Sequence, residues 1–177
     1  MSKEYKRPSK DEYYWNIARE VAGRATCLIA KFGAVIVNND VIISTGYVGA
    51  PRGTKSCIER GYCIRRRDGI PSGTNYERCA SVHAEMNAML HASRTDMIGG
   101  TMYLFGAKRI DGEDIMVDSL PCLICKKMIL NSGVSKFVSN KSSGNLEVFD
   151  VEEWRREWSE RDFLDDKRKY SVDHTTK

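Results

Sequence analysis

The chain has 177 residues, of which 41% are hydrophobic and 29% are charged, and its formal net charge is +4. This composition is typical of a globular domain and excludes a disordered or fibrous protein. The sequence contains no apolar stretch approaching the roughly 20 residues of a membrane-spanning helix, and its first eight residues lack the apolar centre of a signal peptide. We therefore expect a single domain over residues 1–177, located in the cytoplasm.

Six cysteines in such a chain indicate metal ligands rather than disulfides, because a reducing compartment keeps thiols free. The net charge is too small to predict a general nucleic-acid binder. Basic residues are nevertheless concentrated in residues 52–67, where six arginines and lysines accompany one acidic residue. This concentration predicts a local site for an anion.

The first elements are a helix and a hairpin. Residues 11–25 carry apolar side chains at the spacing of one buried helical face, and Ser9 stands where a helix cap is expected. The apolar runs 34–37 and 41–45 follow, separated by an Asn-Asn-Asp turn that tolerates left-handed backbone. We predict two antiparallel strands here.

Residues 49–79 form a Cys-rich segment that also abounds in Gly, Pro and Arg and shows no apolar period. Such a length of irregular chain is unusual in a compact domain and indicates a functional insertion, or one ordered by a metal.

Helices and strands alternate in the second half of the chain. We expect a helix at 82–93, a strand at 101–105, a polar excursion at 106–113, a helix at 121–130 whose first turn begins with Pro121, and a strand at 134–138. This order predicts a three-layer α/β/α domain. Residues 151–177 are predicted to form a charged helical tail bearing Trp154, Trp158 and Phe163, which packs on the domain or on a partner subunit.

Three residues at the starts of two predicted helices could hold one metal. His83, Cys122 and Cys125 offer three ligands and leave a fourth position open, which is typical of catalytic zinc. Helix N-termini favour thiolates, and cysteines three apart on a helix share a face. Residues two apart on a helix point in nearly opposite directions, so His83 and Glu85 serve one site only if His83 lies at or before the first turn. We predict that placement, with Glu85 as the general acid and base beside a zinc-bound water.

Taken separately, each of these signals has another interpretation. A Cys-x-x-Cys pair can be half of a structural zinc site, and a lone histidine is usually a core or surface residue. Together, in this order, they match the H-x-E…P-C-x-x-C signature of zinc deaminases, which favours catalysis. His91 and His174 have no neighbours at ligand spacing and receive no role.

From about residue 11 to residue 138 the sequence resembles the deoxycytidylate deaminases of the cytidine deaminase superfamily. Besides the zinc motif, the resemblance rests on blocks within 25–37, 44–53, 70–73 and 79–88. It implies a cytidine deaminase-like fold with a central mixed sheet of about five strands, and a homo-oligomer, either a dimer or a hexamer. It further implies hydrolysis of dCMP to dUMP and ammonia, with dCTP and dTTP as effectors.

The mechanism that the resemblance implies agrees with the residues found above. Hydroxide on the zinc attacks C4 of cytosine, and Glu85 carries protons to N3 and to the departing amine. Similar enzymes recognise the ring through backbone near the histidine and near the proline. The corresponding candidates here are Ala84 and Leu120.

Two departures from the family pattern concern the substrate. Val48 stands where the family usually has an asparagine that contacts the nucleotide, and Ile29 stands where many bacterial members have an arginine at a phosphate-facing position. An unpaired polar group on the substrate costs about 1–3 kcal/mol, which can change the preferred nucleotide or its effector control. Arg24, Lys31 and Arg52 are the candidate phosphate ligands, with ordinary solvated charges as the alternative.

Four cysteines are left over after the zinc motif: Cys27, Cys57, Cys63 and Cys79. Four thiolates can form a closed tetrahedral zinc site, whereas the alternative is that some are small buried hydrophobic residues. Members of the family have a similar arrangement, and we predict a second, structural zinc.

Two competing functions use the same residues. A deaminase acting on tRNA or single-stranded DNA would need aromatic platforms beside a basic groove, and the basic segment offers little beyond Tyr62, so nucleic acid is an unlikely partner. A non-catalytic zinc module would have no need of a carboxylate at Glu85. The sequence therefore favours a nucleotide deaminase.

Overall fold

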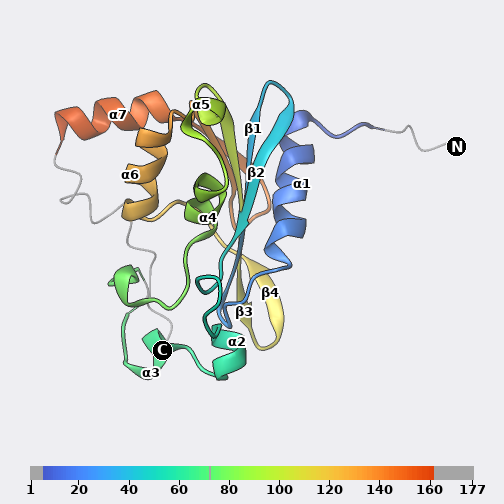
Figure 1. Ribbon diagram of the computed structural model, residues 1–177. Helices are drawn as coiled ribbons and strands as arrows, with labels where there is room; N and C mark the ends of the chain where they lie inside the picture. Colours follow the sequence, from blue (N-terminus) through green and yellow to red (C-terminus); the bar gives the residue numbers. More distant parts are fainter. Residues whose placement is uncertain (1–5, 72, 162–177) are drawn as a thin grey trace, which may run out of the picture.

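The computed structural model describes residues 6–71 and 73–161, and a six-stranded mixed sheet lies at its centre (Figure 1). The strands are β1 Ala30–Asn38, β2 Val41–Tyr47, β3 Thr101–Ile110, β4 Glu113–Met116, β5 Lys136–Asn140 and β6 Leu146–Asp150. Their order is β2-β1-β3-β5-β6, with β4 paired to β3. Strands β3 and β5 are parallel, and the other neighbours are antiparallel. The expected mixed sheet is confirmed.

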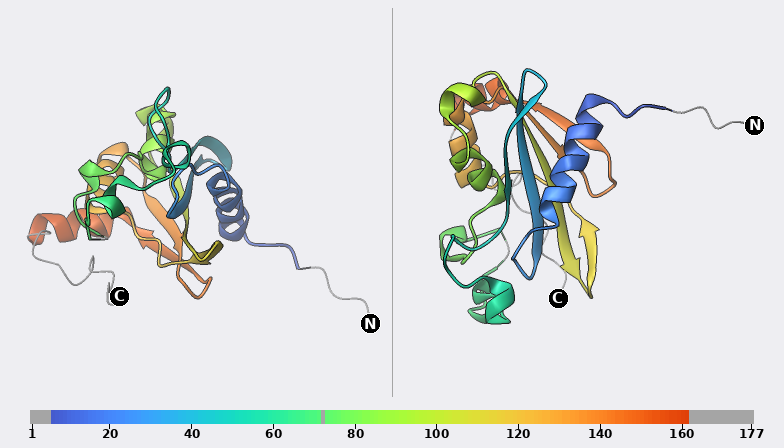
Figure 2. Two further views of the ribbon diagram at one scale, coloured as in Figure 1. Left: turned by 90° about the horizontal axis from the view of Figure 1, so that it is seen from below. Right: turned by 45° about the vertical axis from the view of Figure 1, so that its right-hand side comes forward.

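Helices cover both faces of the sheet. They are α1 Lys10–Ala22, α2 Cys57–Arg60, α3 Ile64–Arg67, α4 Ala84–Leu90, α5 Arg94–Met97, α6 Leu123–Ser132 and α7 Val151–Glu160. Helix α1 lies on one face, whereas α4, α6 and α7 lie on the other (Figures 1 and 2). Alternate residues of β1 serve the two sides: Val35 packs in the cluster with α1, and Ile36 packs in the cluster with α4 and α6. The three-layer α/β/α prediction is confirmed.

The first helix begins and packs as its sequence predicts. Ser9 forms a reciprocal capping box with Glu12, and the buried face carries Tyr14, Trp15 and Ala18. A Cβ atom on Gly33 would lie 2.2 Å from the carbonyl oxygen of Ala18. Glycine at this position of β1 therefore allows α1 to approach the sheet closely.

The expected polar excursion at 106–113 is wrong. Strand β3 continues to Ile110, and a tight turn at Asp111 and Gly112, with φ angles of 50° and 88°, leads into β4. Residues 109–115, which form and flank this turn, are all exposed, so their sequence shows no apolar pattern. The Asp-Gly pair in this turn is a strong hairpin signal. The edge strand β6 was also not expected.

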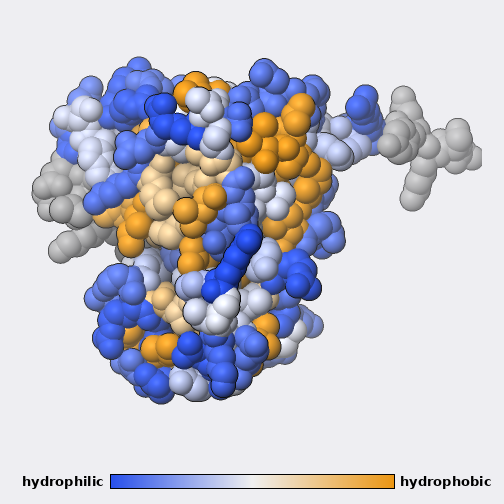
Figure 3. All heavy atoms as spheres, viewed as in Figure 1, coloured by the Kyte–Doolittle hydropathy of each residue, from blue (hydrophilic) through white to orange (hydrophobic). Residues whose placement is uncertain are grey.

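The Cys-rich segment has little hydrophobic support. Helices α2 and α3 have four residues each, and a short 3-10 helix spans Tyr76–Arg78. Within the described part of residues 50–79, only Ser56 and Cys57 are buried. The segment lies beyond one end of the sheet in Figure 1, and in Figure 3 this part of the surface is mostly hydrophilic. Its predicted irregular character is confirmed.

The described part of the C-terminal tail packs on the domain. Trp154 on α7 is buried, and its ring centre lies 5.4 Å from that of Phe137 and 5.6 Å from that of Phe149. The predicted helix is confirmed for Val151–Glu160. Phe163 and His174 lie outside the described residues. None of the helices that the structure describes has the length and apolar character needed to cross a membrane.

Candidate active site

His83 lies immediately before the first turn of α4. It is the N-cap residue, with extended backbone at φ −71° and ψ 156°, as the argument from helical geometry predicts. The preceding residue, Val82, pairs with Gly49 through two backbone hydrogen bonds of 3.1 and 2.8 Å. The entry to α4 is therefore fixed on one side by this bridge and on the other by the fully buried Ala84.

Cys122 and Cys125 lie at the N-terminus of α6. The helix begins at Leu123, so the expectation of Pro121 in its first turn is wrong by two residues. The reason is that the sulfur of Cys122 acts as the cap: it accepts a hydrogen bond from the Cys125 amide at 3.5 Å. Cys125 is fully buried, and Cys122 is partly buried.

The imidazole and the two sulfurs converge. Nδ1 of His83 lies 3.4 Å from Sγ of Cys122 and 3.4 Å from Sγ of Cys125. In a tetrahedral zinc site with ordinary bond lengths, a nitrogen and a sulfur ligand are about 3.6 Å apart. Among the described residues, this is the one group whose three ligand atoms all lie within 4.8 Å of one another. The residues present therefore fit a zinc ion.

Hydrogen bonds and charges within this group shift the pKa values of its side chains. The hydrogen bond between Cys125 and Cys122 lowers the pKa of Cys122 to about 4 and raises the pKa of Cys125. Burial disfavours the charged form of His83, but hydrogen bonding to Cys122 and the nearby Glu85 carboxylate outweigh it, so the pKa of His83 is raised. A cation bound by the two sulfurs would displace the proton of the hydrogen bond between them and hold both cysteines as thiolates.

Glu85 is a buried carboxyl group beside these ligands. Its exposed fraction is 4%, and burial raises its pKa, with a further contribution from Cys122. The carboxyl group also interacts directly with the side chain of Cys125. A carboxyl group with a raised pKa can both accept and donate a proton near neutral pH.

The Cys-rich segment covers this site with two residues that the sequence analysis did not single out. The ring of Tyr76 lies almost perpendicular to that of His83, at an angle of 87° and a centroid distance of 5.0 Å. Arg65 stacks on Tyr76 at 4.6 Å and donates hydrogen bonds to the carbonyl oxygens of Pro71 and Thr74. The sequence signals that included them were the Cys-rich segment 49–79, which contains both, and the basic run 52–67, which contains Arg65 alone.

The two ring-binding candidates lie between His83 and Cys122 in sequence, each close to one of these ligands. Ala84 is fully buried in the first turn of α4, and Leu120, two residues before Cys122, is 44% exposed. Val48 is buried just after β2; its amide donates to the carbonyl oxygen of Phe32 at 3.0 Å, and its own carbonyl accepts from Thr26. The preceding residue, Tyr47, accepts a hydrogen bond from the side chain of Asn87 on α4, at 2.8 Å. The end of β2 therefore lies against α4.

The three candidate phosphate ligands have different surroundings. Lys31 forms an ion pair with Asp114 at 3.5 Å, and Arg52 donates a hydrogen bond of 2.8 Å to Nε2 of His91. Arg24 is exposed in the turn after α1. An ion pair such as that of Lys31 contributes about 0–1 kcal/mol, and a single hydrogen bond such as that of Arg52 about 1 kcal/mol. These contacts leave both side chains available to an anion.

The four remaining cysteines influence one another. Burial raises the pKa of Cys57, and Cys27, Cys63 and Cys79 are all close enough to raise it further. The sulfur of Cys27 accepts hydrogen bonds from the amides of Ile29 and Ala30, at 3.5 and 3.4 Å. Burial raises the pKa of Cys27, and these two hydrogen bonds partly oppose that shift. Among the described residues, the four sulfurs do not form a group of three within 4.8 Å.

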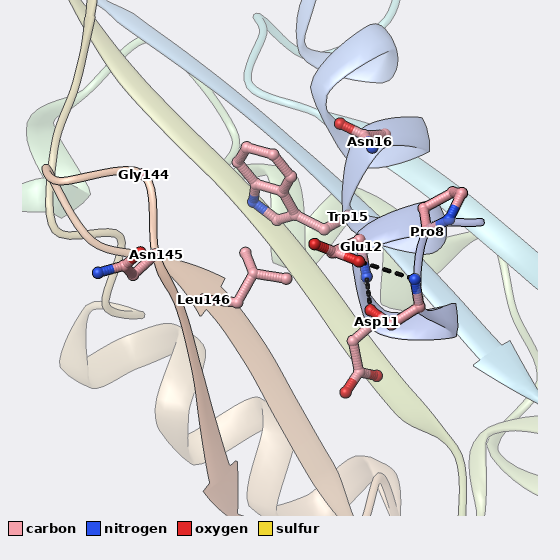
Figure 4. A pocket seen from close by; sticks show the side chains of 9 residues that line it. Pro8, Asp11, Glu12, Trp15, Asn16, Gly144, Asn145 and Leu146 are labelled. Atoms are coloured by element: carbon pink, nitrogen blue, oxygen red, sulfur yellow. Dashed lines mark hydrogen bonds between the residues drawn. The ribbon is translucent and has the colours of Figure 1, made fainter. Parts of the chain in front are cut away.

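A pocket on the other face of the molecule has no connection with these residues. It has a volume of about 500 Å³ and lies between the start of α1 and the turn before β6 (Figure 4). Its carboxylates already have partners, since Glu12 caps α1 and Asp11 accepts a hydrogen bond from Tyr103. We therefore place the candidate site at the N-termini of α4 and α6.

Known proteins are similar to this chain over most of its length. A deoxycytidylate deaminase of Mycobacterium phage D29 is 38% identical over 142 residues, which cover 77% of this chain and 98% of that protein. A deoxycytidylate deaminase of Saccharomyces cerevisiae is 36% identical over 136 residues, which cover 77% of this chain and 39% of that protein.

Solved structures agree in fold. The dCMP deaminase of cyanophage S-TIM5, in complex with dCMP and dUMP, has a TM-score of 0.51 and 25% identity, and the match covers 76% of this chain and 83% of that one. A cytidine deaminase from Burkholderia pseudomallei has a TM-score of 0.54 at 14% identity, covering 82% and 95% of the two chains, which indicates a shared fold alone. The model of the cytidine and deoxycytidylate deaminase zinc-binding region matches residues 8–141, and the chain belongs to this family.

Proposed function

We propose that this protein is a zinc-dependent enzyme that hydrolyses dCMP to dUMP and ammonia. The observation that carries the proposal is the convergence of His83, Cys122 and Cys125 beside the buried carboxyl group of Glu85. Three ligands leave a coordination position for solvent, and the adjacent carboxyl group supplies the acid and base that a purely structural zinc site does not need.

The metal ligands and Glu85 divide the work. A zinc ion held by His83, Cys122 and Cys125 would supply Lewis-acid activation of a water molecule at neutral pH. Glu85 takes a proton from the attacking water, passes a proton to N3 of the ring, and protonates the departing amine. A C–O bond forms at C4 and the C–N bond breaks, so water and dCMP give dUMP and ammonia.

The substrate assignment rests on the similar enzymes and on the charge of the Cys-rich segment. Two relatives named deoxycytidylate deaminase and a structure holding dCMP and dUMP favour a monophosphate. The basic residues of 52–67 lie on the segment that covers the site, where they would attract an anionic nucleotide. Arg24, Lys31 and Arg52 stay candidates for the phosphate, and Ala84, Leu120 and Val48 stay candidates for the nucleoside.

Ammonia release tests this assignment directly. The zinc-loaded protein is assayed with dCMP, dCTP, deoxycytidine, CMP and their 5-substituted forms, and we expect the highest kcat/KM for dCMP. Removal of the metal by a chelator should abolish turnover, and added zinc should restore it. No ammonia from any free nucleotide would refute the proposal and would favour a base within RNA or single-stranded DNA, or a module without activity.

We further propose that Cys27, Cys57, Cys63 and Cys79 bind a second, structural zinc. Support comes from the mutual influence of these thiols and from the amide hydrogen bonds to Cys27. Each amide hydrogen bond stabilises a thiolate, the form that binds zinc. Elemental analysis should give two zinc ions per chain, and one zinc per chain would reject this site.

The proposal also covers the oligomeric state, the location and the regulation of the enzyme. Exposed apolar side chains on β2 and at the end of α4, such as Val41 and Leu90, which are 59% and 70% exposed, support a homo-oligomer. Figure 3 shows hydrophobic surface along this side of the sheet. A cytoplasmic location agrees with free thiols at the metal sites. Control by dCTP and dTTP stays a prediction from the family resemblance.

A further inference from the structure

Asn140, the last residue of β5, has an unusual environment for an amide side chain. It is 1% exposed, yet every polar atom of its side chain has partners. Oδ1 accepts hydrogen bonds from the Gly106 amide at 2.9 Å, the Ser119 hydroxyl at 2.8 Å and the indole N–H of Trp15 at 3.3 Å. Nδ2 donates to the carbonyl oxygens of Gly106 at 3.1 Å and Val117 at 2.9 Å. Burying an amide is unfavourable unless it is paired in this way.

These hydrogen bonds hold a particular stretch of chain. Between Met116, where β4 ends, and Leu123, where α6 begins, the chain forms no helix or strand. Residues 117–119 are nevertheless tethered at each position. The Val117 amide donates to Gly106, and the Ser119 amide donates to the Asn140 carbonyl oxygen at 2.9 Å. The carboxylate of Asp118 accepts from the amide of Ser142 at 2.7 Å.

The tethered stretch leads directly to a metal ligand. Ser119 is 1% exposed, Pro121 is buried, and Cys122 follows. The approach of Ser119 to β3 requires glycine at position 106, because a Cβ there would lie 2.7 Å from the Ser119 hydroxyl and 2.5 Å from the ring of Phe32. Proline at 121 fixes one of the backbone angles between the tether and the cysteine.

We propose that Asn140 and Ser119 are positioning residues, which set where Cys122 presents its sulfur to the metal. On the C-terminal side, Cys122 is held by α6, through the Cys125 amide and the buried Ile129. On the N-terminal side, the Asn140–Ser119 contact is the corresponding anchor. This inference rests on the metal site of the proposed function.

The test uses the full chain loaded with Co²⁺, whose absorption spectrum reports ligand geometry. Ser119→Ala removes one hydroxyl of the anchor, and Asn140→Asp removes the donors to Gly106 and Val117. We expect both variants to shift the absorption bands of the catalytic site and to release metal to a chelator about fivefold faster, since one hydrogen bond contributes about 1 kcal/mol and 1.4 kcal/mol corresponds to tenfold. If the Asn140→Asp variant does not fold, the Ser119→Ala variant alone tests the positioning role.

The matched control is Ser132→Ala. Ser132 is also a buried serine, and its hydroxyl donates to the carbonyl oxygen of Ile129 at 2.8 Å, at the far end of the same helix. Its variant should lose similar stability towards urea and keep the wild-type spectrum and release rate. Identical spectra and release rates for the Ser119 and Ser132 variants would overturn the positioning role.

The bands of the catalytic site are defined as those that Cys125→Ser removes. If that substitution removes none, the metal site itself is refuted, and the positioning role with it. A failure of the proposed function is thereby distinguished from a failure of this inference alone.

Discussion

Five of the six cysteines lie in two regions of this protein, and the two regions are held by different forces. At the N-termini of α4 and α6, the ligands stand on helices whose inner faces are fully buried, as at Ala88 and Ile129. In residues 50–79, the described chain buries little but Cys57, and its helices last four residues. Local hydrogen bonds take the place of a core there, as in the capping box of Ser56 with Glu59.

This difference predicts two uses of a metal. Where a hydrophobic core already fixes the ligands, bound zinc adds chemistry but little to the fold, so it can be lost without unfolding the helices that held it. Where no core exists, the binding free energy of zinc is itself folding free energy. Loss of a metal ligand should therefore unfold the chain in residues 50–79 but leave helices α4 and α6 folded.

The largest effect is expected at Glu85. Glu85→Gln keeps the size of the side chain and removes its ability to exchange a proton. Because general acid and base catalysis contributes about 10²- to 10⁴-fold, ammonia release from dCMP should fall by that factor or more. Zinc content and circular dichroism should match the wild-type protein. Normal turnover in a zinc-loaded variant would refute the role of Glu85.

A second prediction tests the comparison directly through paired cysteine variants. Cys63→Ser should lose one zinc per chain and speed amide exchange in residues 57–67 by about 10²-fold or more, since structural zinc contributes about 10–16 kcal/mol to small zinc domains. Cys122→Ser, the matched variant, should lose the other zinc and all turnover but leave exchange in that segment unchanged. Hydrogen exchange read by mass spectrometry reports both. Equal protection of the segment in the two variants would show that no metal orders it.

Where the placement of a site residue depends only on local helix geometry, it could be predicted from the sequence. The opposed directions of residues two apart on a helix require His83 to precede α4, and the structure places it there. The same reasoning missed the start of α6, because a thiol at Cys122 can cap a helix and proline at 121 can stand just outside it. Neighbouring residues can each cap a helix, and the residue types alone do not determine which of them does.

Contacts that depend on the fold could not be predicted. Tyr76 reaches His83 through a turn in which Asn75 has a φ angle of 48°, and no periodic pattern in the Cys-rich segment indicates this. The end of β3 next to the turn and most of strand β4 are exposed, and no residue of the edge strand β6 is fully buried, so burial leaves no alternation to read in these parts of the sequence. Predictions from apolar spacing are thus confined to elements that face the core.

A smaller effect is expected where the chain departs from its family. Val48 lies at the end of β2, beside α4, and its side chain offers no hydrogen bond. Val48→Asn should change the ratio of kcat/KM between dCMP and the other cytosine nucleotides by about tenfold, because a hydrogen bond to a buried group contributes about 1–3 kcal/mol. The substrate panel measures this ratio. An unchanged profile would mean that this position does not set the preference.

The smallest effect on activity is expected from substitution of Lys31, because this side chain already pairs with Asp114 of the same chain. Its ammonium group lies 3.5 Å from Asp114, which also receives two hydrogen bonds from Arg109, at 3.0 and 3.1 Å. The Lys31–Asp114 pair ties β1 to β4, and a partly exposed pair of this kind contributes about 0–1 kcal/mol. Lys31→Met should therefore raise KM for dCMP by less than about threefold. Deoxycytidine lacks the phosphate, so a rise confined to dCMP would assign Lys31 to the phosphate, whereas an equal change for both substrates reflects only the loss of the β1–β4 contact.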